Sequence, residues 1–224
     1  MRLLLIRHGQ TPANVLGQLN TRKPGPGLTR LGQVQAAAVP GALEAESIER
    51  IFATTLIRTR LTAEPLAEHL GLDVPLLDGL REIEAGDIED LSDPVSVKTY
   101  VSTAVAWAKG DLDLRMPGGP DGHEFFDRFD AAIAQIAAAG PETTAVFSHG
   151  MAIRCWASAR SANIDGSYAA THQLDNTGMV VLDSGDDGSW QMTQWHTPPV
   201  GGLMLHDAVA VDPTGESVET AARP

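Results

Sequence analysis

Apolar residues first gather in a short continuous block near the start of the chain. Residues 3–6 carry four apolar side chains in a row between Arg2 and Arg7. A strand with one exposed face alternates apolar and polar residues, whereas an unbroken run is typical of a strand covered on both faces. We therefore expect a buried strand over residues 2–7. Similar runs predict strands over 48–53 and 143–147.

Other segments repeat their apolar residues at helical spacing. The clearest pattern predicts a helix over residues 125–138, with apolar positions at Phe125, Phe129, Ala132, Ile133 and Ile136. Weaker patterns predict helices over residues 30–39, 58–70, 97–109 and 151–159. Thr29 can cap the first of these, which we expect to end near Pro40 and Gly41. Pro65 should bend the helix over 58–70 or mark an irregular turn, and Gly71 suits the left-handed residue after its end.

The order of these elements predicts the fold class. A strand pair is expected over 179–182 and 191–195, around the turn residues Asp186, Asp187 and Gly188. Strands that alternate with helices indicate an α/β domain with a mainly parallel sheet. We expect one domain over residues 1–196. Residues 197–224, rich in Pro and Gly and then acidic, predict a loosely held tail.

Charge and composition narrow the classes of partner. The 224 residues include 16 Lys and Arg against 29 Asp and Glu, a net charge of −13. This field repels nucleic acids and anionic membrane surfaces, so we expect neither as a partner. Hydrophobic residues make up 43% of the chain, which is enough for a sizeable core. The single cysteine, Cys155, cannot form an intrachain disulfide and is expected in the core, and we expect a cytoplasmic location.

Two predicted strands end in the same short motif. Residues 3–6 run into Arg7-His8-Gly9, and residues 145–147 run into Ser148-His149-Gly150. Open α/β sheets bind ligands at the carboxyl ends of their strands, where a glycine lets backbone and ligand approach closely. A single such histidine could merely satisfy a strand end. Two matching elements, one with an adjacent arginine, favour a ligand-binding site over that explanation.

Five ordered blocks over residues 2–154 resemble the histidine phosphatase superfamily, also called the phosphoglycerate mutase-like family. The blocks are Arg7-His8-Gly9-Gln10-Thr11 with Asn14, Leu28-Thr29 with Gly32 and Gln35-Ala36, Thr55-Leu56-Ile57-Arg58-Thr59 with Thr62-Ala63, Leu80 with Glu82 and Gly86, and Ser148-His149-Gly150 with Ile153-Arg154. The resemblance implies a three-layer sandwich, a mainly parallel central sheet flanked by helices. It also implies a variable helical cover, here about residues 87–122.

The resemblance gives each matched residue a role. It implies that His8 is the nucleophile that forms a phosphohistidine, with a backbone carbonyl fixing its tautomer. Arg7 and Arg58 would hold the phosphoryl oxygens, because a guanidinium binds them in a bidentate way and stays charged. His149 would bind the transferring group. Asn14 and the amide of Gly150 are further candidates for substrate binding.

Glu82 is the candidate general acid, because its spacing to Gly86 matches the family block. Glu84 and Glu89 compete for the role. A phosphate beside this carboxyl would raise its pKa toward the working pH. The five other histidines show no paired spacing of the kind that builds a metal site, so we expect neither metal nor cofactor. His123 and Glu124 stand where the family's loop pattern is altered, and Glu124 can simply favour the start of a helix.

The segment between Asp87 and Asp121 favours hydrolysis over mutase chemistry. It holds three basic and seven acidic residues, a net of −4. A mutase must retain a very anionic substrate, which this balance disfavours. We therefore expect a histidine acid-type phosphatase acting on a small phosphorylated metabolite, with an apolar or sugar part near Tyr100, Trp107 or Met116. A cofactor-dependent phosphoglycerate mutase, a silent phospho-ligand binding module and a possible homodimer stay open.

Overall fold

A five-stranded mixed sheet forms the centre of the computed structural model, which describes residues 1–185, 187–210 and 212–215. Its strands are β1 (Arg2–Arg7), β2 (Arg50–Ala53), β3 (Thr143–Ser148), β4 (Met179–Ser184) and β5 (Trp190–His196). Their order is β2-β3-β1-β4-β5. The β2·β3 and β3·β1 pairs are parallel, while β1·β4 and β4·β5 are antiparallel. The predicted late strand pair is thus a hairpin that extends the parallel part of the sheet.

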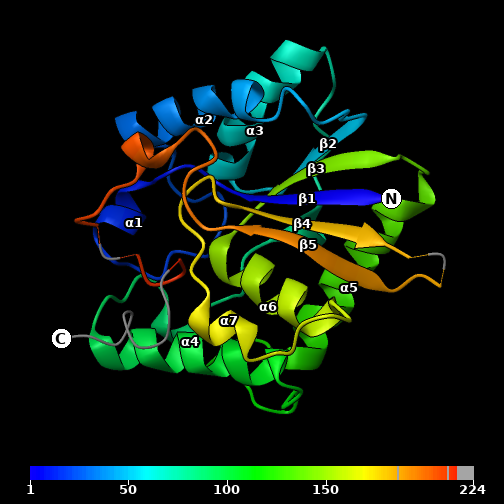
Figure 1. Cartoon of the computed structure of the whole chain (residues 1–224). Helices are drawn as coiled ribbons and strands as arrows, with labels where there is room; N and C mark the ends of the chain where they lie inside the picture. The colour runs from blue at the N-terminus through cyan, green and yellow to red at the C-terminus, as the bar shows by residue number, and fades with distance from the viewer. Residues whose placement is uncertain (186, 211, 216–224) are drawn as a thin grey trace.

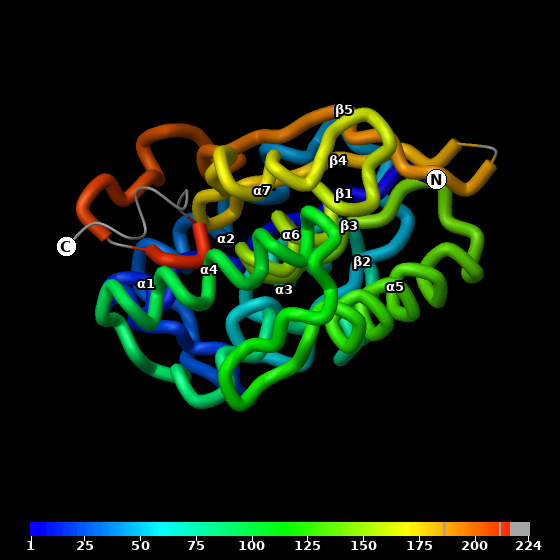
Figure 2. Tube along the Cα trace, turned by 90° about the horizontal axis from the view of Figure 1, so that it is seen from below, coloured from blue at the N-terminus to red at the C-terminus, as the bar shows by residue number. Residues whose placement is uncertain are grey.

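Helices cover both faces of this sheet (Figure 1). One face carries α2 (Arg30–Ala42) and α3 (Ile57–Leu70). The other carries α4 (Pro94–Ala108), α5 (Gly122–Ala138), α6 (Gly150–Arg160) and α7 (Tyr168–Thr171). Figure 2 shows this second layer from below, with α4 crossing in front of α6. Short helical turns complete the chain: α1 (Pro12–Val15), η1 (Asp78–Leu80), η2 (Gly86–Ile88) and η3 (Leu203–Leu205).

The apolar run of β1 is explained by these two layers. Leu4 and Ile6 belong to the core that packs under α2 and α3, whereas Leu3 and Leu5 belong to the core beneath α4, α5 and α6. All four side chains are fully buried. A strand covered on both faces needs apolar residues at every position, as observed here. The predicted three-layer α/β architecture is confirmed.

Two helices contain a proline close to the positions that the sequence analysis singled out. Pro40 lies inside α2, which runs on to Ala42, and Pro65 lies inside α3. In α3 the residues after the proline, Leu66 and Ala67, are buried against the sheet. This packing stabilises the helix more than the missing backbone hydrogen bond destabilises it. Gly71 follows α3 in the predicted left-handed conformation, with φ 66°.

The prediction of a loosely held tail needs correction for its described part. After η3 the chain turns back, and Asp212 and Thr214 both contact the buried guanidinium of Arg7. Arg154, also fully buried, donates to the carbonyl oxygen of Thr214 at 3.0 Å. Two buried cations need acceptors, and this segment supplies them. Residues 216–224 of the predicted tail lie outside the described residues. None of the described helices is long and apolar enough to cross a bilayer.

Candidate active site

His8 lies directly after β1, at the edge where the parallel strands end. Its Nδ1 is 2.8 Å from the carbonyl oxygen of Gly9. A carbonyl can only accept, so Nδ1 carries the proton of the neutral ring and Nε2 keeps its lone pair. The expected backbone acceptor for His8 is therefore present.

Arg58, in the first turn of α3, holds the other side of this ring. Its Nε donates to Nε2 of His8 at 3.1 Å, and its Nη2 donates to the backbone oxygen of Asn20 at 3.0 Å. Burial lowers the pKa of Arg58 to about 10, against the attraction of Glu82. The side chain therefore stays a cation at neutral pH and is aimed at the proposed nucleophilic nitrogen.

His149 follows β3 and completes a pair of rings with His8. The two ring centres are 5.2 Å apart in an edge-to-face arrangement. Burial holds the pKa of both histidines well below its usual range, and the positive charges of Arg58 and Arg7 lower it further. Both rings are therefore neutral at pH 7, the state that a nitrogen nucleophile requires.

Close backbone packing fixes the loop that carries His8. A Cβ on Gly9 would lie 2.7 Å from the carbonyl oxygen of Gly32, and one on Gly32 would lie 2.1 Å from that of Gln10. The amide of Gly9 also donates to the hydroxyl of Thr62 in α3 at 2.9 Å. We expected Gly9 to admit a ligand, whereas here the glycine admits the start of α2. This pairing of two glycines leaves no local signal in the sequence.

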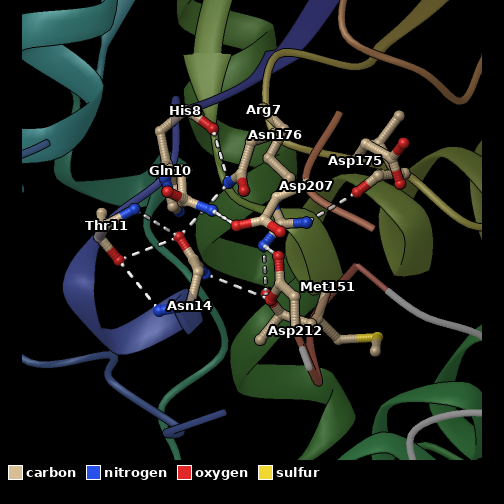
Figure 3. Close-up of polar contacts among 12 residues, drawn as sticks. Arg7, His8, Gln10, Thr11, Asn14, Met151, Asp175, Asn176, Asp207 and Asp212 are labelled. Atoms are coloured by element: carbon tan, nitrogen blue, oxygen red, sulfur yellow. Dashed lines mark hydrogen bonds and ion pairs between the residues drawn. The ribbon is translucent and has the colours of Figure 1, made fainter. Parts of the chain in front are cut away.

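Arg7 and Asn14, both predicted to bind substrate, are engaged by the C-terminal segment (Figure 3). The carboxylate of Asp212 forms an ion pair with Arg7 and accepts from Nδ2 of Asn14 at 3.2 Å. Arg7 also donates to the hydroxyl of Thr214 at 2.9 Å and to the backbone of Leu174 at 2.8 Å. Its Nε, buried, has no hydrogen-bond partner among the described residues. Asp212 was not anticipated, because its contact spans 205 residues of chain.

The same segment lines a hollow beside Arg7. Two polar contacts join residues that line it: Gln10 donates a hydrogen bond to Asp207 at 2.7 Å, and His206 lies 2.7 Å from Asp175. Arg7 lines this hollow too. The tail therefore stands between solvent and the arginine that was predicted to bind phosphate.

Gly150 begins α6 in close contact with Arg7. A Cβ at this position would lie 2.6 Å from the carbonyl oxygen of Thr214 and 2.9 Å from Nε of Arg7. Asn176, just before β4, donates to the backbone oxygen of His8 at 3.1 Å. The predicted site residues thus converge from β1, α3, β3 and α6 on one edge of the sheet.

Glu82 occupies the start of α6 from the loop after η1. Its carboxylate accepts from the amide of Ile83 at 2.9 Å, from Met151 at 3.2 Å and from Ala152 at 2.8 Å. Burial raises the pKa of Glu82, and these three donors together with Arg58 oppose the rise. The direction of the shift suits a general acid, while the donors bind the ionised form. Of the competing carboxylates, Glu84 pairs with Arg81 at the surface, and Glu89 accepts from the amide of Thr21.

Several other expectations find ordinary structural explanations. Tyr100, Trp107 and Met116, proposed as contacts for a substrate, are fully buried in the core, so that expectation is wrong. The Tyr100 hydroxyl donates to the backbone oxygen of Ile83 at 2.8 Å. Cys155 is buried, as expected, and burial raises its pKa.

The altered loop before α5 forms a helix cap. Asp121 is the N-cap residue, and the carboxylate of Glu124 accepts a hydrogen bond from the backbone amide of Asp121 at 2.9 Å. His123 is exposed and lies 3.2 Å from Asp113. The interpretation of Glu124 as a favourable acid in the first turn is confirmed.

Comparisons with known proteins agree with this geometry. The family description "Histidine phosphatase superfamily (branch 1)" matches residues 3–198. The chain is 37% identical to the PE-PGRS family protein PE_PGRS11 of Mycobacterium tuberculosis over 92% of its own length, but it spans only 38% of that protein. It is 27% identical to a probable phosphoglycerate mutase GpmB of Salmonella choleraesuis, covering 95% of this chain and 98% of that one.

Solved structures with a similar fold include two phosphatases. The mycobacterial glucosyl-3-phosphoglycerate phosphatase Rv2419c, complexed with VO3, superposes with a TM-score of 0.74 and 26% identity over 88% of this chain and 99% of that one. The alpha-ribazole phosphatase from Shigella flexneri shares the fold, with a TM-score of 0.70 and 24% identity over 89% and 97%. The predicted enzyme class, a histidine-type phosphatase, is confirmed by the family match and the phosphatase structures. With its two strand-end histidines on one sheet edge and a match over most of its length, the chain belongs to the histidine phosphatase superfamily, branch 1.

Proposed function

We propose that the protein hydrolyses a phosphate monoester of a small metabolite, with Nε2 of His8 as the nucleophile. The observation that carries this proposal is the state of the His8 ring. Its proton is held on Nδ1 by the Gly9 carbonyl, and its lone pair on Nε2 lies 3.1 Å from the Arg58 guanidinium. A phosphoryl group that reaches Arg58 would therefore meet an unprotonated nitrogen.

The reaction would proceed in two displacements. Nε2 of His8 attacks phosphorus as the bond to the leaving oxygen breaks, and Glu82 gives that oxygen its proton. Water then attacks the phosphohistidine, Glu82 takes a proton from the water, and the bond from nitrogen to phosphorus breaks. Both steps develop charge on the phosphoryl oxygens, which fixed hydrogen-bond donors stabilise.

Arg7, Arg58 and His149 are the donors that we propose for these oxygens, with Asn14 and the amide of Gly150 beside them. Arg58 adjoins His8 directly. Arg7 and Asn14 now bind the carboxylate of Asp212, an anion in the position we propose for a phosphoryl oxygen. Substrate would have to displace this carboxylate in order to use all five donors.

The charge of the helical cover limits the substrate. Residues 87–121 carry a net charge of −4, which disfavours a bisphosphate and the retention of a very anionic intermediate. We therefore propose a substrate with one phosphoryl group. Because the similar structure is named a glucosyl-3-phosphoglycerate phosphatase, that ester belongs in the first panel of compounds, alongside simple sugar phosphates.

A mutase is the second candidate, because the chain also resembles proteins named probable phosphoglycerate mutase over nearly their whole length. The two activities separate in one assay. Incubation with 3-phosphoglycerate and a bisphosphate primer should release inorganic phosphate or give no turnover. Conversion to 2-phosphoglycerate without net phosphate release would reject the phosphatase proposal.

The direct test is the substitution His8→Ala. We expect loss of hydrolysis of a chromogenic phosphate ester by at least about a thousandfold, since the nucleophile is removed. Acid-labile, base-stable phosphate should appear on the wild-type chain during turnover and be absent from the variant. His123→Ala, at an exposed histidine away from the sheet edge, is the matched control and should hydrolyse the ester at the wild-type rate. Equal rates for His8→Ala and wild type would reject His8 as the nucleophile.

A further inference from the structure

Arg128, on α5, binds the backbone of residues 79–83, the Glu82 loop. Its Nη1 donates to the carbonyl oxygens of Gly79 at 2.7 Å and Arg81 at 2.8 Å, and its Nη2 donates to that of Glu82 at 2.7 Å. A guanidinium presents its N–H donors in a rigid planar fork, so one side chain fixes three peptide groups relative to one another. Burial lowers the pKa of Arg128 to about 10, so the side chain stays a cation at neutral pH and these hydrogen bonds are charge-assisted.

The two remaining carbonyl oxygens of the Glu82 loop are also bound by side chains. The hydroxyl of Ser148, at the end of β3, donates to the oxygen of Leu80 at 2.8 Å. The hydroxyl of Tyr100, on α4, donates to the oxygen of Ile83 at 2.8 Å. Side-chain donors thus bind five consecutive carbonyl oxygens. Arg128 supplies three of these five contacts, so its loss would leave most of the loop without them.

The Glu82 loop also lies directly on the backbone of α5. A Cβ at Gly79 would lie 2.4 Å from the carbonyl oxygen of Arg128 and 2.9 Å from Cβ of Ala132. The guanidinium of Arg128 is itself held over the fully buried ring of Phe125, 5.1 Å from its centre. The arginine therefore joins the loop to a helix whose apolar face is packed in the core.

Glu82 depends on this loop for the position of its carboxylate. The side chain is buried, and its oxygens accept from the amides of Met151 at 3.2 Å and Ala152 at 2.8 Å in the first turn of α6. A general acid works only within hydrogen-bond reach of the leaving oxygen, and a displacement of about 1 Å can cost about a hundredfold in rate. Because the loop is bound to α5 and the carboxylate to α6, a shift of the loop would draw the carboxylate away from α6.

We propose that Arg128 is a positioning residue, which holds the carboxyl group of Glu82 within reach of the leaving oxygen by fixing the Glu82 loop against α5. In this role Arg128 acts through Glu82 and exchanges no proton with the substrate. The part of the inference that concerns the leaving oxygen rests on the proposed function. The position of the carboxylate relative to α6 does not, and it can be measured without substrate.

The first test is the substitution Arg128→Met, which removes the donors and keeps much of the side-chain length. We expect kcat to fall roughly tenfold to a hundredfold for an alkyl phosphate, whose leaving oxygen needs a proton. The fall should be smaller for an aryl ester with a good leaving group, and KM should change less than kcat. Arg128→Lys, which keeps the charge and some of the donors, should lie between Arg128→Met and wild type.

A double-mutant cycle with Glu82→Gln separates positioning from general damage. If Arg128 acts through Glu82, Arg128→Met should lower kcat for the alkyl phosphate by less than about twofold once the acid is gone. The same fold-loss in both backgrounds overturns the inference. Should Arg128→Met fail to fold, Arg128→Lys takes its place in the cycle and the same comparison decides.

Arg160→Met is the matched control. Arg160, the last residue of α6, also binds α5: it forms an ion pair with Asp130 at 2.7 Å and lies over the ring of Phe126, 4.2 Å from its centre. We expect this variant to keep the wild-type kcat on both kinds of ester. If Arg160→Met loses as much activity as Arg128→Met, weaker packing of α5 is responsible and the inference is wrong.

Amide hydrogen exchange at Met151 and Ala152 reports the position of the Glu82 carboxylate without substrate, because both amides donate to it. They should exchange at least about tenfold faster in Arg128→Met and at the wild-type rate in Arg160→Met. Unchanged exchange in Arg128→Met overturns the inference even if the enzyme is an active phosphatase. Faster exchange in this variant, with no ester hydrolysis by wild type, would reject the proposed function and support the positioning of Glu82 by Arg128.

Discussion

Neutral histidines at the sheet edge couple the stability of this protein to pH. His8 and His149 are both buried, and burial together with nearby positive charge holds their pKa values well below the usual 6.5. The unfolded chain exposes the same rings to water, where they take up protons near pH 6.5. Protonation therefore favours the unfolded state, and folding is favoured where both rings are neutral.

We expect the free energy of unfolding to fall as the pH is lowered below 6.5. Each histidine that is protonated only in the unfolded chain contributes a slope of about 1.4 kcal/mol per pH unit. Urea denaturation at pH 7.5, 6.5 and 5.5 measures this slope. Glu82, whose pKa is raised by burial, acts in the opposite direction as the pH falls. The His8→Asn variant isolates one histidine and should show a shallower slope; an identical slope would contradict the assignment.

Two glycines of α2 differ in what surrounds them, although both lie in the same helix. Gly32 sits against the backbone of Gln10, where a Cβ would lie 2.1 Å from the carbonyl oxygen, whereas Gly41 has nothing within 4 Å. The first glycine therefore sets the distance between this helix and the loop that carries His8. At Gly41, which makes no such contact, the missing side chain has no packing role.

The paired substitutions Gly32→Ala and Gly41→Ala test this difference. We expect Gly32→Ala to lose about 1–3 kcal/mol of unfolding free energy and to lower kcat, because the loop must move away from the helix. Gly41→Ala should gain about 0.5–1 kcal/mol through helix propensity and keep full activity. Thermal denaturation and ester hydrolysis measure both effects. Equal behaviour of the two variants would show that the close approach is unimportant.

The carboxylate of Glu82 also stabilises an element, because it accepts from two amides in the first turn of α6. Glu82→Gln turns one acceptor into a donor that faces N–H groups. We expect a loss of about 1–3 kcal/mol in unfolding free energy. We also expect a large fall in kcat for esters with poor leaving groups and a smaller fall for good ones. Equal losses on both kinds of ester would exclude the general-acid role.

Glu84→Gln is the control for this experiment. Glu84 comes from the same stretch of chain, but its side chain is half exposed and pairs with Arg81 at the surface. Substitution of such a residue usually changes stability by less than about 0.5 kcal/mol. A comparable loss in both variants would show that the charge of this loop, and not the contact with α6, is responsible.

Local patterns in the sequence predicted the elements better than the contacts between them. The apolar run of β1 and the helical period of α5 each reflect a buried face, so they can be read from a few neighbouring residues. The end of α2 at Ala42 lies close to the end expected near Pro40 and Gly41, and α3 runs through Pro65 to Leu70, where its end was expected. The contact between Arg128 and the backbone of Glu82 could not have been found in this way, since the two residues are 46 positions apart.

At the scale of the molecule, the two ends of β1 carry similar ion pairs with different surroundings. Arg2 pairs with Asp183 at 3.2 Å near the surface, while Arg7 is fully buried and pairs with Asp212. The first pair is exposed to solvent and contributes little. In the second pair, the carboxylate of Asp212 binds Arg7, an arginine that we propose for phosphate binding.

We therefore expect Asp212→Ala to bind inorganic phosphate or vanadate several-fold more tightly, because the ligand no longer competes with a carboxylate for Arg7. Inhibition of ester hydrolysis by phosphate measures the change. Asp183→Ala removes the corresponding partner at the far end of the strand and should leave inhibition unchanged. Weaker phosphate binding by Asp212→Ala would mean that this carboxylate helps to build the site.

The central position of β1 has a consequence for synthesis of the protein. Leu3 pairs with Thr144 of β3 on one side and with Leu182 of β4 on the other. The first strand to be synthesised therefore pairs only with strands that are synthesised much later. At translation rates of about 5–20 residues per second, its apolar side chains wait roughly 7–28 s for β3 to leave the ribosome. Such contacts between distant residues slow folding and leave a nascent strand open to aggregation or to chaperones. His8 and His149 can therefore meet only late in folding, when β3 docks beside β1.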